Sequence, residues 1–304
     1  MRALASPASL KGVLSAREAA AALAEGLRIG GAEAEELPIA DGGEGTADVL
    51  DARVRDFVTV PDAFARPREA PIRELVDGAA VVESAEVIPL DPARLDPLTA
   101  SSRGLGELIA HVRAPHLLVC LGGTANVDAG AGLLEVLAEL PAPTTVLCDA
   151  LVPLRDAARR FAAQKGATPE QIDVLEQRLA AIEALAAFAE VPGAGAAGGL
   201  GAALASLGAE LVPGAGEVLQ RLHFRERVRN SDLVVTGEGT VDATTATGKA
   251  PGEALRVCRE ERVRCVLFGG RVETELEGAE TVALSGDPVR ARDDLAELGE
   301  RLAN

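Results

Sequence analysis

The chain alternates short apolar runs with longer stretches whose apolar residues recur at helical spacing. Apolar runs of strand length lie at 2–5, 37–40, 116–121, 144–148, 232–235 and 263–268. Most of these runs end in a glycine- or aspartate-rich turn, and a helical pattern follows further along the chain. Strands that alternate with helices in this way predict an α/β fold built on a parallel sheet.

Two segments are the clearest helix predictions. Ser15 and Glu18 have the spacing of a capping box before the alanine-rich stretch 16–27. Residues 169–189 have apolar side chains at helical spacing, with Pro169 in the first turn where proline is tolerated. We therefore predict that a helix begins after Ser15 and that another covers most of 169–189.

Residues 56–98 have a different pattern, because short extended runs alternate there with prolines. This pattern favours antiparallel strands over crossover helices and indicates an inserted second domain. The predicted division is a discontinuous flavodoxin-like α/β domain of residues 1–55, 99–135 and 227–304, interrupted by a second α/β domain of residues 56–98 and 136–226.

Composition narrows the class of protein. The 304 residues are 48% apolar, lack Trp and Tyr, and carry a formal charge of −17. This excludes a disordered chain and disfavours nucleic acid as a partner, because phosphate backbones attract cationic proteins. The four cysteines match no zinc spacing and are predicted to be buried thiols. Without a secretory leader or a run of membrane-spanning length, the chain is expected to be cytoplasmic, with no membrane partner, and a homo-oligomer stays open.

Acids and glycines follow several of the predicted strands. Because loops and helix N-termini converge at the carboxyl ends of parallel strands, we expect these groups to share one edge of a sheet. Each acid–glycine turn alone is also explained by helix capping, but several gathered carboxylates favour a bound Mg²⁺. The residues are Asp41, Glu44, Gly122, Gly123, Thr124, Asp128, Asp149, Glu238 and Asp242.

The chain has only three lysines, Lys11, Lys165 and Lys249, and each stands beside a glycine in a loop before a predicted helix. Lys249 lies in TGEGTVDATTATGKAP, which resembles a phosphate loop but lacks the Walker spacing. Lysines among acids could hold a phosphate as point charges, although a surface role for any one of them stays open.

Two further motifs leave alternatives open. Ser101, Ser102 and Arg103 precede a predicted helix, so they could bind a carboxylate or cap the helix. The segment GAGAAG, with Gly193, Gly195 and Gly198, formally matches a dinucleotide fingerprint, but a helix-like stretch and a proline precede it instead of a strand. We interpret it as a glycine-rich helix start that admits close approach of another element or an anion.

The motifs together resemble the bacterial class I glycerate kinases, which phosphorylate glycerate with ATP and magnesium. The blocks that carry the resemblance, in order, are LKGVLSAREAA, PIADGGEGT, DPLTASSRGLGELI, GGTANVDAGAGLL, QKGA, VPGAGAAGGLGAAL, LGAELVPG and SDLVVTGEGTVD with TGKAPG. The resemblance implies the interrupted flavodoxin-like fold and a glycerate or similar hydroxy-acid substrate, usually converted to 2-phosphoglycerate.

The resemblance also suggests roles for the site residues. Asp41 or Asp242 would act as the base or orienting acid, with Lys249 as a third catalytic residue. Asp149 and Glu238 would help to hold Mg²⁺. Substrate and phosphate binding would fall to Lys11, Ser101, Ser102, Arg103, Gly122, Gly123, Thr124, Asp128, Lys165, Gly193, Gly195 and Gly198.

The chain departs from the family pattern where polar or charged residues are usual. These positions carry Ala8, Val127, Leu151, Val152 and Thr240. Losing polar groups beside a site usually costs affinity or rate. The alternative interpretation is therefore a catalytically impaired homologue that binds a metabolite or a partner.

Overall fold

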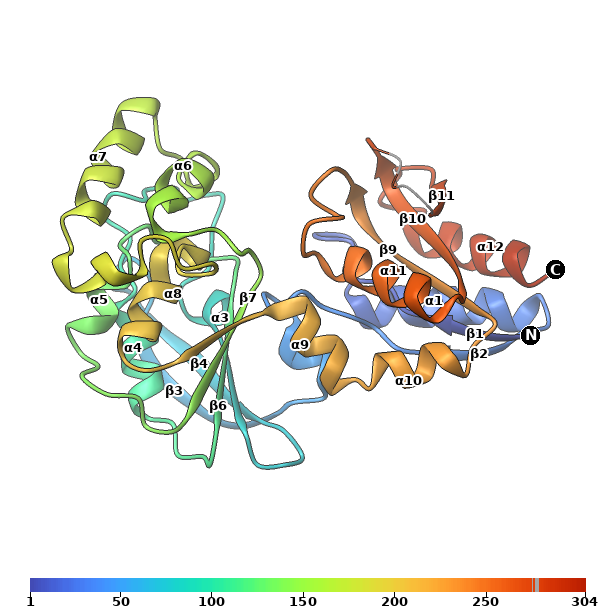
Figure 1. Cartoon of the computed structure of the whole chain (residues 1–304), viewed down its shortest axis with the longest axis horizontal. Coiled ribbons are helices and arrows are strands. Elements are labelled where there is room, and N and C mark those ends of the chain that lie inside the picture. The colour runs from blue at the N-terminus through green and yellow to red at the C-terminus, as the bar shows by residue number, and fades with distance from the viewer. Residues whose placement is uncertain (275, 277–278) are drawn as a thin grey trace. The chain divides into compact units, whose positions relative to one another are not determined.

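The computed structural model describes residues 1–274, 276 and 279–304. By its internal contacts the chain divides into two compact units, each with its own sheet. The terminal unit comprises Met1–Asp41 and Ala215–Asn304, and the central unit comprises Gly42–Gly214. Figure 1 labels their elements. The chain thus enters and leaves the central unit from within the terminal unit.

The terminal unit contains a five-stranded sheet of order β11-β10-β9-β1-β2, in which every pair of neighbours is parallel. Its elements are β1 (Arg2–Ala5), α1 (Ala16–Ile29), β2 (Glu33–Glu36), α9 (Gly214–Arg221), α10 (Phe224–Arg229), β9 (Leu233–Val241), α11 (Ala250–Glu261), β10 (Arg264–Val272), β11 (Glu280–Ala283) and α12 (Ala291–Ala303).

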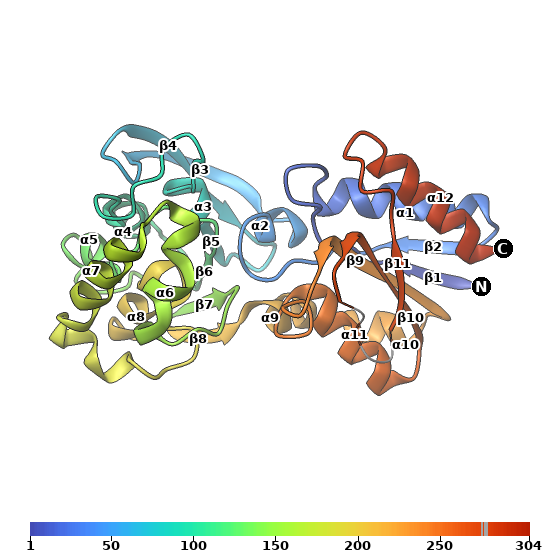
Figure 2. The ribbon, with the colours of Figure 1, turned by 90° about the horizontal axis from the view of Figure 1, so that it is seen from above.

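Helices cover both faces of this sheet (Figure 2). Successive residues of a strand point to opposite faces, and β1 shows this directly. Ala3 and Ala5 pack in the core beneath α1 and α12, whereas Leu4 packs in the core beneath α10 and α11. The inner strands β1, β9 and β10 are buried on both faces over most of their length and therefore read as apolar runs, whereas the edge strands β2 and β11 are largely exposed or partly buried.

The strand order of the terminal unit is the flavodoxin-like order, since its five strands run 2-1-3-4-5 when counted along the unit. The direction of winding reverses between β1 and β9. The chain goes from β1 outward through α1 to β2, and from β9 outward through α11 to β10. The expected α/β fold, a flavodoxin-like parallel sheet interrupted by a second α/β unit, is confirmed.

The central unit contains a mixed six-stranded sheet of order β3-β4-β5-β6-β7-β8, antiparallel from β3 to β5 and parallel from β5 to β8. Its elements are α2 (Thr46–Val49), β3 (Arg53–Pro61), β4 (Pro67–Glu74), β5 (Ala80–Glu83), α3 (Ser84–Val87), α4 (Arg103–Ala110), β6 (Leu117–Leu121), α5 (Ala131–Leu134), β7 (Thr144–Cys148), α6 (Ala157–Phe161), α7 (Pro169–Ala180), α8 (Ala196–Ser206) and β8 (Glu210–Pro213), with 3₁₀ helices η1 (Leu154–Asp156), η2 (Ala163–Lys165) and η3 (Glu183–Phe188).

The division seen in the structure differs from the one expected from the sequence pattern. The range 99–135, assigned there to the discontinuous domain, falls within the central unit because β6 pairs in parallel with β5 and β7. The antiparallel strands expected within 56–98 are present as β3, β4 and the start of β5. The return to the terminal unit comes at Ala215, earlier than expected.

Two element boundaries also differ from the sequence pattern. The strand expected at 37–40 is Glu33–Glu36, and the apolar residues follow its end. The helix expected over 169–189 ends at Ala180, and η3 continues the chain. Leu179 and Leu185 both lie in one buried cluster. A continuous helix would place them about 120° apart, so the break lets both reach that core.

Other local expectations are confirmed. Ser15 and Glu18 form the capping box of α1 in both directions, and the four cysteines are buried free thiols. Among the helices that the structure describes, none is long and apolar enough to cross a membrane.

Candidate active site

A partly buried ion cluster lies at the carboxyl end of β9 in the terminal unit. Lys249 Nζ donates to Glu238 Oε2 at 3.1 Å and lies 3.7 Å from Asp242 Oδ1. Thr245 Oγ1 donates to Glu238 Oε1 at 2.7 Å. We call these four residues the β9 cluster. It brings one of the predicted metal ligands together with two of the predicted catalytic residues.

The local fold explains why these side chains meet. Gly237 packs against the backbone of Phe268 on β10, which leaves no room for a side chain. Asp242 Oδ1 accepts from Thr244 N at 2.7 Å and Thr244 Oγ1 at 2.5 Å, so the chain turns immediately after β9. Lys249 is the N-cap residue of α11 and projects back towards that turn.

The pKa values of the two acids in this cluster are shifted in opposite directions, that of Glu238 mainly by burial and that of Asp242 mainly by hydrogen bonding. Burial raises the pKa of Glu238, and the nearby Asp41 charge adds to this effect, while Thr245 and Lys249 oppose it. The hydroxyl of Thr244 lowers the pKa of Asp242. The two acids of the cluster therefore differ in pKa, with that of Glu238 raised and that of Asp242 lowered from their ordinary values.

A second cluster surrounds Lys165 in the central unit. Lys165 is only 3% exposed, and its Nζ donates to Asn126 O at 2.6 Å and to Thr124 Oγ1 at 3.3 Å. Burial lowers the pKa of Lys165 to about 7, while the charges of Asp149 and Asp128 act in the opposite direction. We call these five residues the Lys165 cluster. A lysine held in this way links the loops that follow β6 and β7.

Asp128 ties together the loops at the end of β6. Its Oδ2 accepts from Ser102 N at 2.8 Å, from Ser102 Oγ at 2.7 Å and from Gly132 N at 3.3 Å. Its Oδ1 accepts from Asn126 Nδ2 at 2.8 Å and from Gly130 N at 3.0 Å. Each carboxylate oxygen of Asp128 thus accepts at least two hydrogen bonds from within the protein. In this structure Asp128 holds the surrounding loops in position.

The polar side chains of residues 101–103 also form hydrogen bonds within the protein. Ser102 is fully buried and Ser101 Oγ accepts from Arg103 N at 3.2 Å. The guanidinium of Arg103 bonds the carboxylates of Glu107 and Glu135 on the surface. Ser102 occupies the N-cap position of α4 without a side-chain capping bond, and carboxylate binding by this segment stays a prediction.

The glycines after β6 allow acids to approach the backbone. A Cβ at Gly122 would lie 2.7 Å from Asp149 Oδ2, and Gly123, at φ +64°, lies beside Glu44. These two turns therefore place carboxylates against the carboxyl end of β6, as the strand-end rule predicts.

The glycine-rich segment Gly193, Gly195 and Gly198 is closely packed. A Cβ at Gly195 would lie 2.5 Å from Pro153 O, and one at Gly198 would overlap Asn126 O. The 3₁₀ helix η3 precedes the segment in place of a strand. This removes the context of a dinucleotide fingerprint and supports the interpretation of a helix start built for close approach.

Three residues that support the site were not identified from the sequence. Glu83 is 4% exposed and accepts from Gly45 N at 3.0 Å and from Ala47 N at 2.6 Å. Ser84 Oγ donates to Gly122 O and accepts from Gly122 N. The third is Thr245. Two features of the sequence could have indicated these residues. Glu83 and Ser84 form a polar pair directly after the apolar run AVV, and Thr245 lies in a threonine-rich turn after β9.

Replacing Glu83 with Gln should change the pH dependence of stability. Burial raises the pKa of Glu83 from 4.5 to about 6. A raised carboxyl pKa favours folding below the unfolded-state value, and this contribution is lost as pH rises through the folded-state value. Between about pH 4 and pH 7 the free energy of unfolding of the wild type should fall by about 2 kcal/mol relative to Glu83→Gln.

Chemical denaturation across this pH range measures the difference. Ser84→Ala is the matched control, because it disturbs the adjacent turn without removing a titrating group. Its difference from the wild type should not vary with pH. A pH-independent difference for Glu83→Gln would contradict the assignment.

The predicted site residues divide between the two units, so two sheet edges carry them instead of one. The terminal unit holds Lys11, Asp41, Glu238, Asp242 and Lys249. The central unit holds Ser101, Ser102, Arg103, Gly122, Gly123, Thr124, Asp128, Asp149, Lys165, Gly193, Gly195 and Gly198. Within the described part of the chain, no three His, Cys, Asp or Glu side chains are grouped so that they could hold a metal ion by themselves.

The sequence of the chain is similar to known proteins over most of its length. The model of the glycerate kinase family matches residues 3–140 and 140–287. A protein of Bacillus subtilis strain 168 named glycerate kinase is 32% identical, over 90% of this chain and 86% of its own. A glycerate 2-kinase of Escherichia coli strain K12 is 33% identical, over 86% of this chain and 82% of its own.

A solved structure from Salmonella typhimurium LT2 that carries the name glycerate kinase 2 has the same fold. It superimposes with a TM-score of 0.79 at 29% identity, covering all of this chain and 97% of its own. The interrupted α/β fold and these matches define a kinase, an enzyme of nucleotide-dependent phosphoryl transfer. The chain belongs to the glycerate kinase family.

Proposed function

We propose that this kinase transfers the terminal phosphoryl group of ATP, with Mg²⁺, to a hydroxyl of glycerate and forms 2-phosphoglycerate. The observation that carries the proposal is the β9 cluster, in which Lys249 Nζ lies 3.1 Å from Glu238 and 3.7 Å from Asp242. Relatives named glycerate kinase and glycerate 2-kinase support the choice of substrate and product.

The β9 cluster suits phosphoryl transfer because this reaction depends mainly on positioning and on neutralising charge. The Lys249 ammonium can stabilise negative charge on a transferring phosphoryl group. Lys249 is anchored by two carboxylates and is the N-cap residue of α11, so its position is set before substrate arrives. Preorganisation of this kind raises the rate because it does not require reorganisation in the transition state.

The proton of the attacking hydroxyl needs an acceptor. Asp41 and Asp242 are the expected bases, and Glu238, whose pKa is raised by burial, is a further carboxylate in the β9 cluster. In the geometry described, one oxygen of Asp242 accepts from both Thr244 N and Thr244 Oγ1, which suits an orienting role for Asp242.

The donor set fits magnesium. Mg²⁺ prefers carboxylate oxygen and keeps several waters, so it is usually held by one or two carboxylates together with substrate phosphates. Each of the two expected carboxylates is an oxygen donor of this kind: Asp149 lies against the backbone of Gly122 in the central unit, and Glu238 belongs to the β9 cluster of the terminal unit. When bound, the ion would neutralise the charge of the phosphates.

The structure gives a reason for two of the positions at which this chain departs from the family pattern, Val127 and Thr240. Val127 is 1% exposed and packs with Leu154 and Leu175, so its apolar side chain lies in a core. Thr240 pairs with Arg271 on β10, so a cation remains at that position of the sheet edge. We therefore argue for an active kinase. The impaired homologue, suggested also by Ala8, Leu151 and Val152, is the outcome that an activity assay would reveal.

The experiment is a coupled assay of ADP formation by the full-length protein. Glycerate should support turnover far above the rate of ATP hydrolysis alone, and other small hydroxy acids should be poorer substrates. Activity should be lost on chelation of divalent metal and return with Mg²⁺. If no hydroxy acid supports turnover while glycerate still raises the melting temperature, the kinase proposal is wrong and the binding homologue is favoured. Cytoplasmic localisation and homo-oligomerisation stay predictions.

A further inference from the structure

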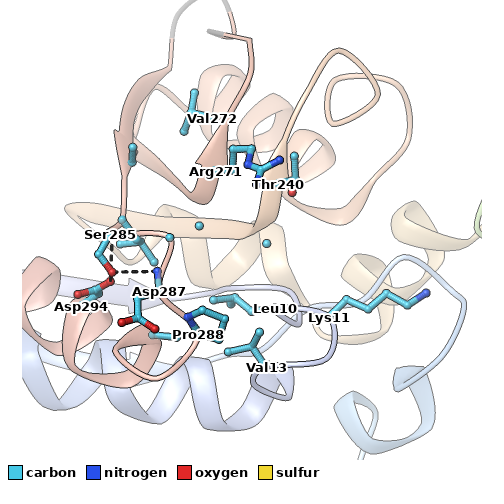
Figure 3. Close-up of a pocket in the computed structure, with 16 residues that line it drawn as sticks. Leu10, Lys11, Val13, Thr240, Arg271, Val272, Ser285, Asp287, Pro288 and Asp294 are labelled. Carbon is cyan, nitrogen blue, oxygen red and sulfur yellow. Dashed lines mark hydrogen bonds between the residues drawn. The ribbon is translucent and has the colours of Figure 1, made fainter.

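A cavity of about 690 Å³ opens at the carboxyl edge of the five-stranded sheet (Figure 3). Its walls come from the loop after β1 and from the ends of β9, β10 and β11. One side of the cavity, where the loop after β1 meets the end of β9, lies at the point at which the winding of the sheet reverses. Open α/β sheets bind ligands at such a point, outside the carboxyl ends of their strands.

The walls of the cavity combine apolar side chains with bare backbone. Leu10, Val13, Val272 and Pro288 supply apolar surface, while Gly239 and Gly270 expose peptide groups. A Cβ added at Gly239 would meet only ordinary contacts at 3.7 Å and 3.8 Å, so the space in front of this strand end is open. Apolar side chains and exposed peptide groups suit a planar ring system, which needs apolar faces and a few polar groups at its rim.

Charged groups occupy separate positions around the cavity. Asp287 Oδ1 accepts from Val289 N at 3.0 Å, which leaves its other oxygen available to a ligand. Arg271 extends from β10 beside Thr240 (Figure 3), and its side chain is 77% exposed with its carboxylate partner Glu273 3.8 Å away. A carboxylate and a separate cation fit a ligand with hydroxyls at one place and negative charge at another.

From these observations we infer that the cavity holds the nucleoside of the phosphate donor, with its base between the apolar walls, its ribose hydroxyls on Asp287 and its phosphates towards Arg271. This inference deepens the proposed function and rests on it for the identity of the donor. A three-carbon acid is too small to fill the cavity. The cavity volume lies within the range of roughly 300–1,000 Å³ that is typical of sites for larger ligands.

The test fills the cavity and measures binding of ADP to the full-length protein by calorimetric titration. Ala283 is exposed and lines the cavity, so Ala283→Trp should weaken ADP binding at least tenfold. Val289→Trp is the matched control, because Val289 is 90% exposed in the neighbouring loop and is not part of the cavity wall. The affinity of the Val289→Trp variant for ADP should stay within twofold of that of the wild type.

Asp287→Asn provides a second variant that keeps the acceptor for Val289 N. The wild type should bind ADP several-fold more tightly than 2′,3′-dideoxy-ADP, and this preference should disappear in Asp287→Asn. Cross-linking with 2-azido-ADP, followed by peptide mapping, should label the segments 239–241, 270–272 or 283–288. This measurement is independent of how well the variants fold.

Unchanged ADP affinity in a folded Ala283→Trp, or labelling confined to the central unit, would overturn the inference. The proposed function is judged separately by the turnover of glycerate. Turnover without an effect of Ala283→Trp refutes the nucleoside site and leaves the function standing. ADP binding that Ala283→Trp weakens, in a protein that phosphorylates no hydroxy acid, supports the site and refutes the function.

Discussion

Replacing Lys249 with Met should lower kcat/KM for glycerate by about 10²- to 10³-fold, the loss typical when one preorganised charge-stabilising donor is removed. The loss should appear mainly in kcat, because Lys249 is proposed to act on charge that develops during transfer. Removing the ammonium also raises the pKa of Glu238 further, since Lys249 opposes that rise. Steady-state kinetics over a pH series measures both effects.

Two controls separate this role from a general loss of structure. Lys249→Arg keeps the charge and should retain more activity than Lys249→Met. Arg264→Met removes a half-exposed cation that pairs with Glu280 at the start of β10, and its kcat/KM should stay within twofold of the wild type. If Lys249→Met keeps more than a third of the wild-type kcat/KM, the β9 cluster is not the catalytic centre.

The second large effect concerns Lys165 and the stability of the central unit. Burial lowers the pKa of Lys165 from 10.5 to about 7. The unfolded chain therefore binds a proton between these values that the folded chain does not, so stability rises with pH in this window. Relative to Lys165→Met, the wild type should gain about 3 kcal/mol of unfolding free energy between about pH 7 and pH 9.5.

Denaturant unfolding of both proteins across this pH range provides the measurement, since groups common to both cancel in the difference. Gln164→Met is the matched control, because Gln164 is the exposed neighbour of Lys165 and does not titrate. The difference in unfolding free energy between Gln164→Met and the wild type should not change with pH. If the Lys165→Met difference is equally constant, Lys165 is not the buried ammonium described here.

Local features of the fold could be predicted from the sequence because they depend on neighbouring residues. The capping box of Ser15 and Glu18 needs only three-residue spacing, and it is present. The choice of sheet for β6 could not be predicted. Leu117–Leu121 is buried on both faces, and such a run suits any parallel sheet equally well. Strand pairing, which places β6 in the central unit, depends on distant contacts.

The same distinction applies to the candidate site. The strand-end rule selected Glu238, Asp242 and Lys249 as a group, and the structure brings them together. The rule could not separate groups that point towards a ligand from groups that brace a loop. Asp128 is the clearest example, because its bonds to Ser102 come from a helix entrance 26 residues away in the chain.

The central claim is that the β9 cluster serves the phosphorylation of glycerate, and the product of the reaction tests it most directly. Full-length protein with D-glycerate, ATP and Mg²⁺ can be followed by ³¹P NMR, with Lys249→Met in parallel. The account predicts equal amounts of ADP and 2-phosphoglycerate from the wild type and almost none from the variant. Unchanged ATP in both samples, or equal product from both, would contradict it.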